Sequence, residues 1–163
     1  MAHNGTICFY PCAGRDIALP RRLLRNKVDQ IICCDTDPRY NNFLDKEKNK
    51  KEDSPECHFV KGDARNVVID LERIDILFHR NDSWGEGGSG VPVLSYHFLP
   101  LVIERMPDKG GLIYTDGSNS LQSWFERISR PNGVERCGCH FEPIEVINDI
   151  RPLPIWVISV QKS

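Results

Sequence analysis

The sequence predicts an α/β protein in which helices cover both faces of a mostly parallel sheet, followed by an antiparallel strand pair at the C-terminal end. Three observations support this three-layer architecture. Five short apolar runs alternate with helical patterns or loops, turn-forming or acidic residues follow these runs, and two further runs near the C-terminus have no helical pattern between them. A chain of 163 residues is long enough for one such domain over residues 1–163.

The composition is that of an ordinary soluble globular protein, with 40% hydrophobic and 27% charged residues. The formal net charge of −2 supplies no field for nucleic acid or an anionic membrane. We therefore expect a small-molecule or protein substrate rather than nucleic acid. No apolar run approaches the roughly 20 residues that span a bilayer, so we expect no membrane partner.

Cysteine usage favours a reduced, cytoplasmic protein. The chain has seven cysteines, an odd number, and no secretory leader precedes them. Most of them lie in or beside apolar runs, where a thiol behaves as a small hydrophobe. Cys137, Cys139 and His140 are the only metal-like cluster, and because no second ligand pair accompanies them we expect no metal site.

The stretch over residues 6–16 predicts a strand, a tight turn and a helix. An apolar strand over 7–10 stops at Pro11, small residues over 12–14 form the turn, and a helix covers 17–25. Small residues let backbone N–H groups approach a ligand closely, and a helix N-terminus favours negative charge. The turn therefore suits a nucleotide-like ligand, with a plain strand-to-helix connection as the alternative.

The second predicted strand, over residues 29–35, ends in an acidic residue. Asp35 lies about 20 positions beyond the first turn, and in dinucleotide-binding folds an acid at that place binds a ribose hydroxyl. Residues 36–38 then begin a second helix, with Pro38 at its first position. The two features are separated by one helix, as a βαβ unit requires.

The remaining elements follow in the same alternation. We expect strands over 57–60, 74–79 and 110–115, a loop over 61–65, helices over 67–71 and 91–106 and after residues 116–119, and an antiparallel hairpin at one sheet edge from strands over 137–146 and 156–160.

The loop over residues 80–90 contains four glycines between Gly85 and Gly90, and it also contains Trp84. A long loop at the carboxyl end of a parallel strand is a usual place for ligand binding. An ordinary surface loop is the alternative, but a tryptophan in such a loop usually covers a ligand or contacts a partner. The loop is therefore a candidate ligand cover or protein-contact surface.

Five βα units followed by an antiparallel pair resemble the class I, Rossmann-like methyltransferases that use S-adenosylmethionine. Residues 11–14, Pro-Cys-Ala-Gly, look like the Phe/Pro-x-Ala-Gly form of that family's first motif. The resemblance implies S-adenosylmethionine as cofactor, with Asp35 on the ribose, the 62–64 loop near the adenine, and Arg80 and Asn81 facing the methyl donor. The implied cofactor-binding residues are Tyr10, Pro11, Cys12, Ala13, Gly14, Asp35, Thr36, Asp63, Ala64, Arg80, Asn81 and Trp84.

The implied reaction is transfer of the sulfonium methyl group to a nucleophile, for which positioning is the main requirement. Candidate bases are Asp82 and His79, because both follow or end the fourth strand. Trp84 would cover the donor's positive charge, since aromatic faces attract cations.

Asp16 departs from the family pattern, because it stands where the last motif glycine is expected. A carboxylate there would face the cofactor's own carboxylate, with Arg15 as the residue that offsets it. The alternative hypothesis is therefore a catalytically silent methyltransferase-like fold that binds another protein, as an inhibitor or immunity-type module, through the 80–90 loop. A nicotinamide dehydrogenase is a third possibility, but the three-glycine fingerprint that it needs is absent.

Overall fold

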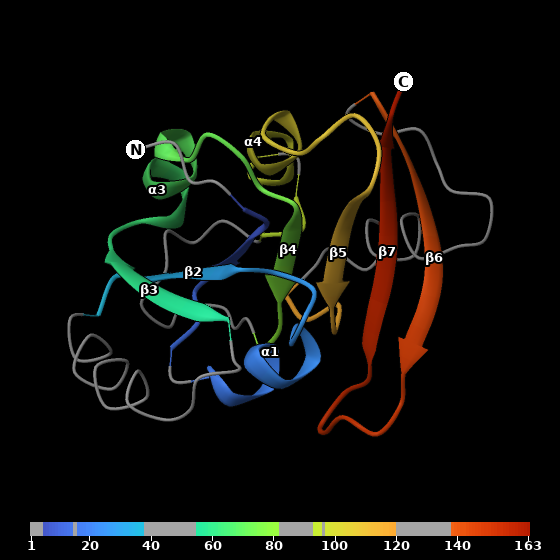
Figure 1. Ribbon diagram of the computed structural model, residues 1–163, viewed down its shortest axis with the longest axis horizontal. Coiled ribbons are helices and arrows are strands. Elements are labelled where there is room, and N and C mark those ends of the chain that lie inside the picture. The colour runs from blue at the N-terminus through green and yellow to red at the C-terminus, as the bar shows by residue number, and fades with distance from the viewer. Residues whose placement is uncertain (1–4, 15, 38–54, 82–92, 96, 120–137) are drawn as a thin grey trace.

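The computed structural model describes residues 5–14, 16–37, 55–81, 93–95, 97–119 and 138–163. Within these residues one sheet has the strand order β3-β2-β1-β4-β5-β7-β6 (Figure 1). The strands are β1 (Ile7–Pro11), β2 (Gln30–Asp35), β3 (Glu56–Lys61), β4 (Ile76–His79), β5 (Gly111–Thr115), β6 (Cys139–Ile147) and β7 (Ile155–Lys162). Strands β1 to β5 pair in parallel, whereas β7 is antiparallel to β5 and to the edge strand β6. The predicted α/β fold with a C-terminal antiparallel pair is confirmed.

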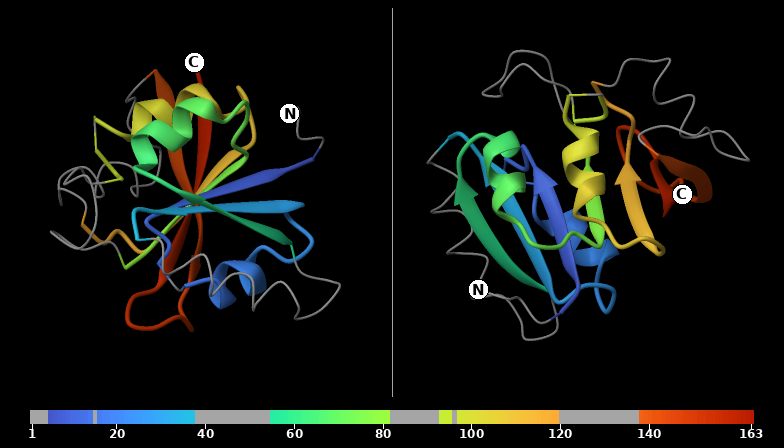
Figure 2. Two further views of the ribbon diagram at one scale, coloured as in Figure 1. Left: turned by 90° about the vertical axis from the view of Figure 1, so that its left-hand side faces the viewer. Right: turned by 90° about the horizontal axis from the view of Figure 1, so that it is seen from above.

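Strand β1 lies inside the sheet, between β2 and β4, and is buried along its whole length. Side chains alternate between the two faces of a strand. Ile7 and Phe9 belong to one apolar cluster, and Cys8 and Tyr10 belong to a second cluster. Helices α3 and α4 cover the face of the first cluster and α1 lies on the opposite face (Figure 2). The run is continuously apolar because both faces of the sheet are covered.

The helices differ from the predicted ones at their ends. Helix α1 (Ala18–Leu23) is shorter than the expected 17–25, and α3 (Ala64–Asp70) starts within the expected 61–65 loop. It starts early because the Asp63 carboxylate accepts a hydrogen bond from Arg65 N at 2.9 Å and caps the helix. The helices predicted after residues 38 and 119 lie outside the described residues.

Helix α4 (Leu99–Glu104) is also much shorter than the predicted 91–106. Pro100 explains where it begins, since proline has no N–H and fits only the first turn of a helix. Residues 93–95 and 97–98 precede it as bends and turns. None of the described helices is long and apolar enough to cross a membrane.

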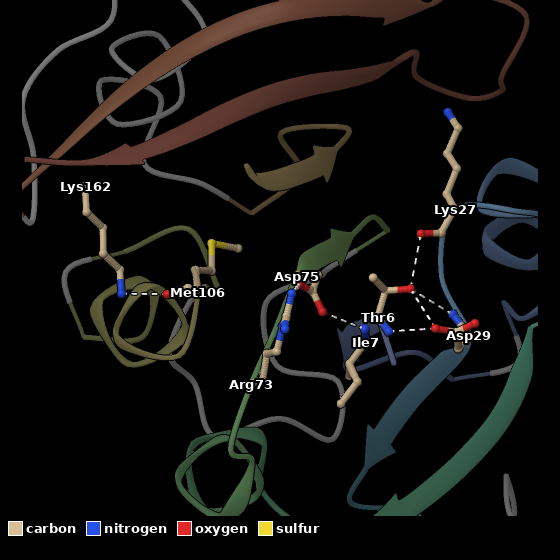
Figure 3. Close-up of polar contacts among 8 residues, drawn as sticks. All are labelled: Thr6, Ile7, Lys27, Asp29, Arg73, Asp75, Met106 and Lys162. Atoms are coloured by element: carbon tan, nitrogen blue, oxygen red, sulfur yellow. Dashed lines mark hydrogen bonds and ion pairs between the residues drawn. The ribbon is translucent and has the colours of Figure 1, made fainter. Parts of the chain in front are cut away.

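The amino ends of the parallel strands are fastened by two carboxylates (Figure 3). Asp29 Oδ2 accepts a hydrogen bond from Thr6 N at 2.7 Å, which ties the start of β1 to β2. Asp75 Oδ2 accepts one from Ile7 N at 2.8 Å, which ties β1 to β4. These contacts hold the central strands together at their amino ends.

Candidate functional site

The order of the strands identifies where a ligand is expected to bind. The chain passes from β1 to β2 and β3 on one side, and then from β4 to β5 on the other side. In sheets of this kind, ligands bind where the order reverses, outside the carboxyl ends of the strands. Here the order reverses between β1 and β4, and we call this expected ligand position, outside the carboxyl ends of the two strands, the crevice. Residues 12–14 and 16 approach it from β1, and residues 80–81 approach it from β4.

The turn after β1 contains two residues in the left-handed conformation. Cys12 has φ 56° and Gly14 has φ 54°, a conformation that glycine adopts without cost and that other residues adopt at about 1 kcal/mol. Ala13 N donates to Cys34 O at 3.2 Å, and Gly14 N donates to Asp35 Oδ2 at 3.2 Å. The turn is therefore held directly against the end of β2, so Gly14 and Asp35 converge on one place.

The Asp35 carboxylate is positioned by backbone groups on both sides. Its Oδ1 accepts from Asp37 N at 3.0 Å, while Oδ2 accepts from Gly14 N. Each carboxylate oxygen can accept two hydrogen bonds, so each keeps capacity for one more donor. Gly62 N donates to Asp35 O at 2.9 Å, which brings the β3 loop to the same place. Two oxygens that can each accept one more hydrogen bond fit the two hydroxyls of a ribose, which can donate them.

The Asp16 side chain contacts Tyr10 and Arg80. Its carboxylate accepts a hydrogen bond from Tyr10 Oη at 2.6 Å and pairs with Arg80 Nε at 3.1 Å. Its charge is therefore offset by Arg80, at the end of β4, whereas Arg15 lies outside the described residues. Burial and the neighbouring Asp16 carboxylate raise the pKa of Tyr10 well above its usual value. Arg80 is therefore the described residue that offsets this charge, and the expected role of Arg15 stays a prediction.

The β4 side of the crevice repeats the arrangement seen at Asp35. Asp116, which follows β5, accepts from Asn81 N through Oδ2 and from Ser118 N through Oδ1, both at 2.9 Å. Asn81 has φ 52°, as Gly14 has φ 54° on the other side. Asp116 is not among the site residues predicted from the sequence, although its position directly after a parallel strand is the same signal that identified Asp35.

His79 lies inside the protein rather than in the crevice, with 1% of its surface exposed. Its Nδ1 is 2.7 Å from Thr115 Oγ1, which also accepts a hydrogen bond from Gly117 N at 2.9 Å. The imidazole and the hydroxyl together fix the loop after β5 against the end of β4. This burial favours a positioning role for His79 over direct contact with a substrate, and Thr115 is a residue that the sequence analysis missed.

The Asp63 carboxylate has a structural role in addition to the expected adenine contact. It caps α3 and pairs with Arg65 Nη2 at 3.1 Å. The Arg65 side chain lowers the pKa of Asp63, so this group stays charged over the physiological pH range. Ala64 is a buried residue of the first turn of α3.

The structure divides the other predicted site residues into three groups. Tyr10 and Pro11 at the end of β1 are buried, as is Ala13 in the turn, whereas Cys12 and Thr36 are exposed. Asp82 and Trp84 lie outside the described residues. Within the described part of the chain, no three His, Cys, Asp or Glu side chains are grouped as a metal site requires.

No protein-family model matches this chain, and no curated protein matches it in sequence. Solved structures do match. A precorrin-6y C5,15-methyltransferase from Geobacter metallireducens is 17% identical, with 99% of this chain and 82% of that chain covered and a TM-score of 0.60. An rRNA methylase from Streptococcus thermophilus is 10% identical, with 96% and 86% covered and a TM-score of 0.56.

TrmN from Thermus thermophilus is 17% identical, with a TM-score of 0.60, and 99% of this chain covers 45% of TrmN. At this level of identity the similarity concerns the arrangement of the strands and helices. The seven-stranded mixed sheet of the described residues matches these structures in strand direction and in the antiparallel pair that ends it. The chain therefore has the fold of the class I S-adenosylmethionine-dependent methyltransferases.

Proposed function

We propose that this chain is an S-adenosylmethionine-dependent methyltransferase, working as one domain over residues 1–163. The observation that supports the proposal best is the hydrogen bond from Gly14 N to Asp35 Oδ2 at 3.2 Å. It joins the small-residue turn to the acidic end of the next strand beside the crevice between β1 and β4. A ligand with a ribose next to a polar tail would meet both groups at once.

In this proposal Asp35 accepts hydrogen bonds from the ribose hydroxyls, and the turn over residues 12–14 lies along the tail of the cofactor. The loop that begins at Gly62 would lie near the adenine, because Gly62 N is bonded to Asp35 O. When bound, S-adenosylmethionine supplies an electrophilic methyl group on a sulfonium. The residues of the chain would orient the acceptor, a small molecule or a protein, and keep water away.

Base catalysis and covering of the donor are proposed for the loop after β4. Asp82 is the proposed base, because His79 is buried against Thr115 and would act by positioning the loop ends. Trp84 is proposed to cover the positive charge of the donor. Asn81, whose backbone N–H is held by Asp116, is the last residue before this loop that the structure describes.

Calorimetric titration with S-adenosylmethionine tests the proposal, and the chain offers a matched pair of variants. Asp35 and Asp29 lie at opposite ends of β2, and each accepts a backbone N–H from the β1 side of the sheet. We expect micromolar binding to the unchanged chain. Asp35→Ala should weaken it by roughly tenfold or more, since hydrogen bonds to a charged group are lost. Asp29→Ala should leave the affinity unchanged.

Equal losses in the two variants would show that Asp35 acts only on the sheet and would contradict the assignment. The second candidate function is a catalytically silent fold that binds another protein through the 80–90 loop. It is favoured by one observation, the ion pair between Asp16 and Arg80 that bridges the crevice at 3.1 Å. Absence of any heat at millimolar S-adenosylmethionine, in a chain that is shown to be folded, would support this second function.

A further inference from the structure

Two side chains from opposite sides of the crevice meet above the end of β1. Asp16 follows β1 and Arg80 follows β4, and their ion pair joins Nε to Oδ2 at 3.1 Å. Tyr10 Oη donates to the same oxygen at 2.6 Å. One carboxylate oxygen therefore accepts a hydrogen bond from a tyrosine that is 1% exposed and pairs with an arginine whose side chain is 12% exposed.

The two donors are better anchored than the acceptor. Arg80 Nη2 also donates to Arg151 O at 3.3 Å, in the turn between β6 and β7. The Asn81 amide oxygen, in the orientation that satisfies its hydrogen bonds, lies 3.1 Å from Arg80 Nε and Nη2. The side chain of Asp16 is 25% exposed, and its backbone N–H is bonded to Ala13 O at 3.0 Å. Rotation of the Asp16 side chain can therefore remove the acceptor while both donors stay in place.

If Asp16 moves away, Tyr10 requires another acceptor and Arg80 requires another negative charge, because Arg151 O and the Asn81 amide oxygen are uncharged. A buried hydroxyl left without a partner costs about 1–3 kcal/mol, and a guanidinium that is mostly removed from water costs more when its counter-charge is taken away. A ligand that displaces Asp16 must therefore bring an oxyanion of its own. A carboxylate meets this need, because it can accept from a phenol and a guanidinium together.

We propose that Asp16 is an internal competitor for the acidic end of the ligand, and that Arg80 and Tyr10 are the donors for which the two carboxylates compete. The inference rests on the proposed function for the adenosyl part of the ligand and adds the chemistry of the other end. A carboxylate-bearing ligand binds only after the contacts of Asp16 are opened. A ligand without a carboxylate leaves the ion pair closed, so its affinity does not depend on the charge of Asp16.

Two probes that differ in their tails test the inference by calorimetric titration of the full chain. S-adenosylhomocysteine carries a carboxylate, whereas 5′-methylthioadenosine has the same nucleoside and no amino-acid group. Asp16→Asn keeps the size of the side chain and an oxygen for Tyr10 but removes the competing charge. We expect it to raise the affinity for S-adenosylhomocysteine by roughly tenfold and to leave that for 5′-methylthioadenosine within about twofold.

Two further variants complete the design. Arg80→Gln should abolish the gain when it is combined with Asp16→Asn, and retained binding of 5′-methylthioadenosine shows that the double variant is folded. Asp29→Asn removes one negative charge at the amino end of β2, where Asp29 bonds to Thr6 (Figure 3). It should change the affinity for neither probe, which separates a local effect from a change in net charge.

The possible results separate this inference from the proposed function. If both probes bind and Asp16→Asn changes the affinity for S-adenosylhomocysteine by less than about twofold, the inference is overturned and the proposed function stands. A weaker affinity in Asp16→Asn also overturns it, because Asp16 would then be receiving the ligand's ammonium group. If neither probe binds to any of the variants, both proposals fail. Binding of S-adenosylhomocysteine gained only in Asp16→Asn supports the inference.

Discussion

Replacing Asp75 with alanine tests how β1 is fastened to β4, the two strands that border the crevice. The Asp75 residue is 8% exposed, and its Oδ2 accepts a hydrogen bond from Ile7 N at 2.8 Å. Its Oδ1 accepts from Arg73 Nε at 2.8 Å. Asp75 N also donates to Ile7 O at 2.8 Å, a contact that the substitution leaves in place.

The two side-chain contacts of Asp75 differ in how much they contribute to the free energy of unfolding. The bond from Ile7 N is buried, and a hydrogen bond to a charged group contributes about 1.5–3 kcal/mol. The Arg73 side chain is 55% exposed, so solvent screening limits its ion pair to about 1 kcal/mol or less. We therefore expect Asp75→Ala to lower the free energy of unfolding by about 2–3 kcal/mol, and Arg73→Ala to lower it by less than about 1 kcal/mol.

Urea denaturation of the two variants measures this difference directly, because an unchanged slope with a shifted midpoint reports a change in stability alone. For a chain of this size the expected loss corresponds to a fall in Tm of about 4–12 °C. Equal losses in Asp75→Ala and Arg73→Ala would refute the reasoning. A loss below about 0.5 kcal/mol in Asp75→Ala would also do so, since the cost of burying the carboxylate would then cancel its hydrogen bonds.

Two more predictions concern groups away from this contact. Iodoacetamide at about pH 8 should label Cys12 before Cys34, because Cys12 is exposed. Burial raises the pKa of Cys34 to about 12 and keeps it as the unreactive thiol. Mass spectrometry of the native protein that finds Cys34 labelled first would contradict this. Lys162→Met should lower the free energy of unfolding by about 1 kcal/mol without changing ligand affinity, since Lys162 Nζ donates to Met106 O at 2.6 Å beyond the end of α4. Thermal denaturation and the titration described above check both parts.

The strands were the part of the fold that the sequence predicted best. The runs that became β1, β2, β4 and β5 are nearly continuous in apolar residues, and only strands covered on both faces need that composition. The absence of a helical pattern between the last two runs likewise predicted the antiparallel pair. These are local signals, so they could be interpreted without knowing the neighbours of each segment.

The ends of the helices were predicted less well, because single contacts decide them. The Asp63 cap starts α3 at Ala64, and Pro100 restricts α4 to a short segment. Apolar spacing alone continues through both boundaries, since residues outside a helix also pack into the core. Leu94 and Phe98, for example, are buried although they precede α4.

The sequence by itself determined that a small-residue turn and an acid would lie at the carboxyl ends of neighbouring strands, because chain direction and strand order place Gly14 and Asp35 together. Only the tertiary structure decided the state of Asp16, whose charge is offset by Arg80. It also decided the part played by Asp116, which holds Asn81 N. Both contacts join segments that are far apart in the chain, and such contacts depend on the packing of the whole sheet rather than on any local pattern.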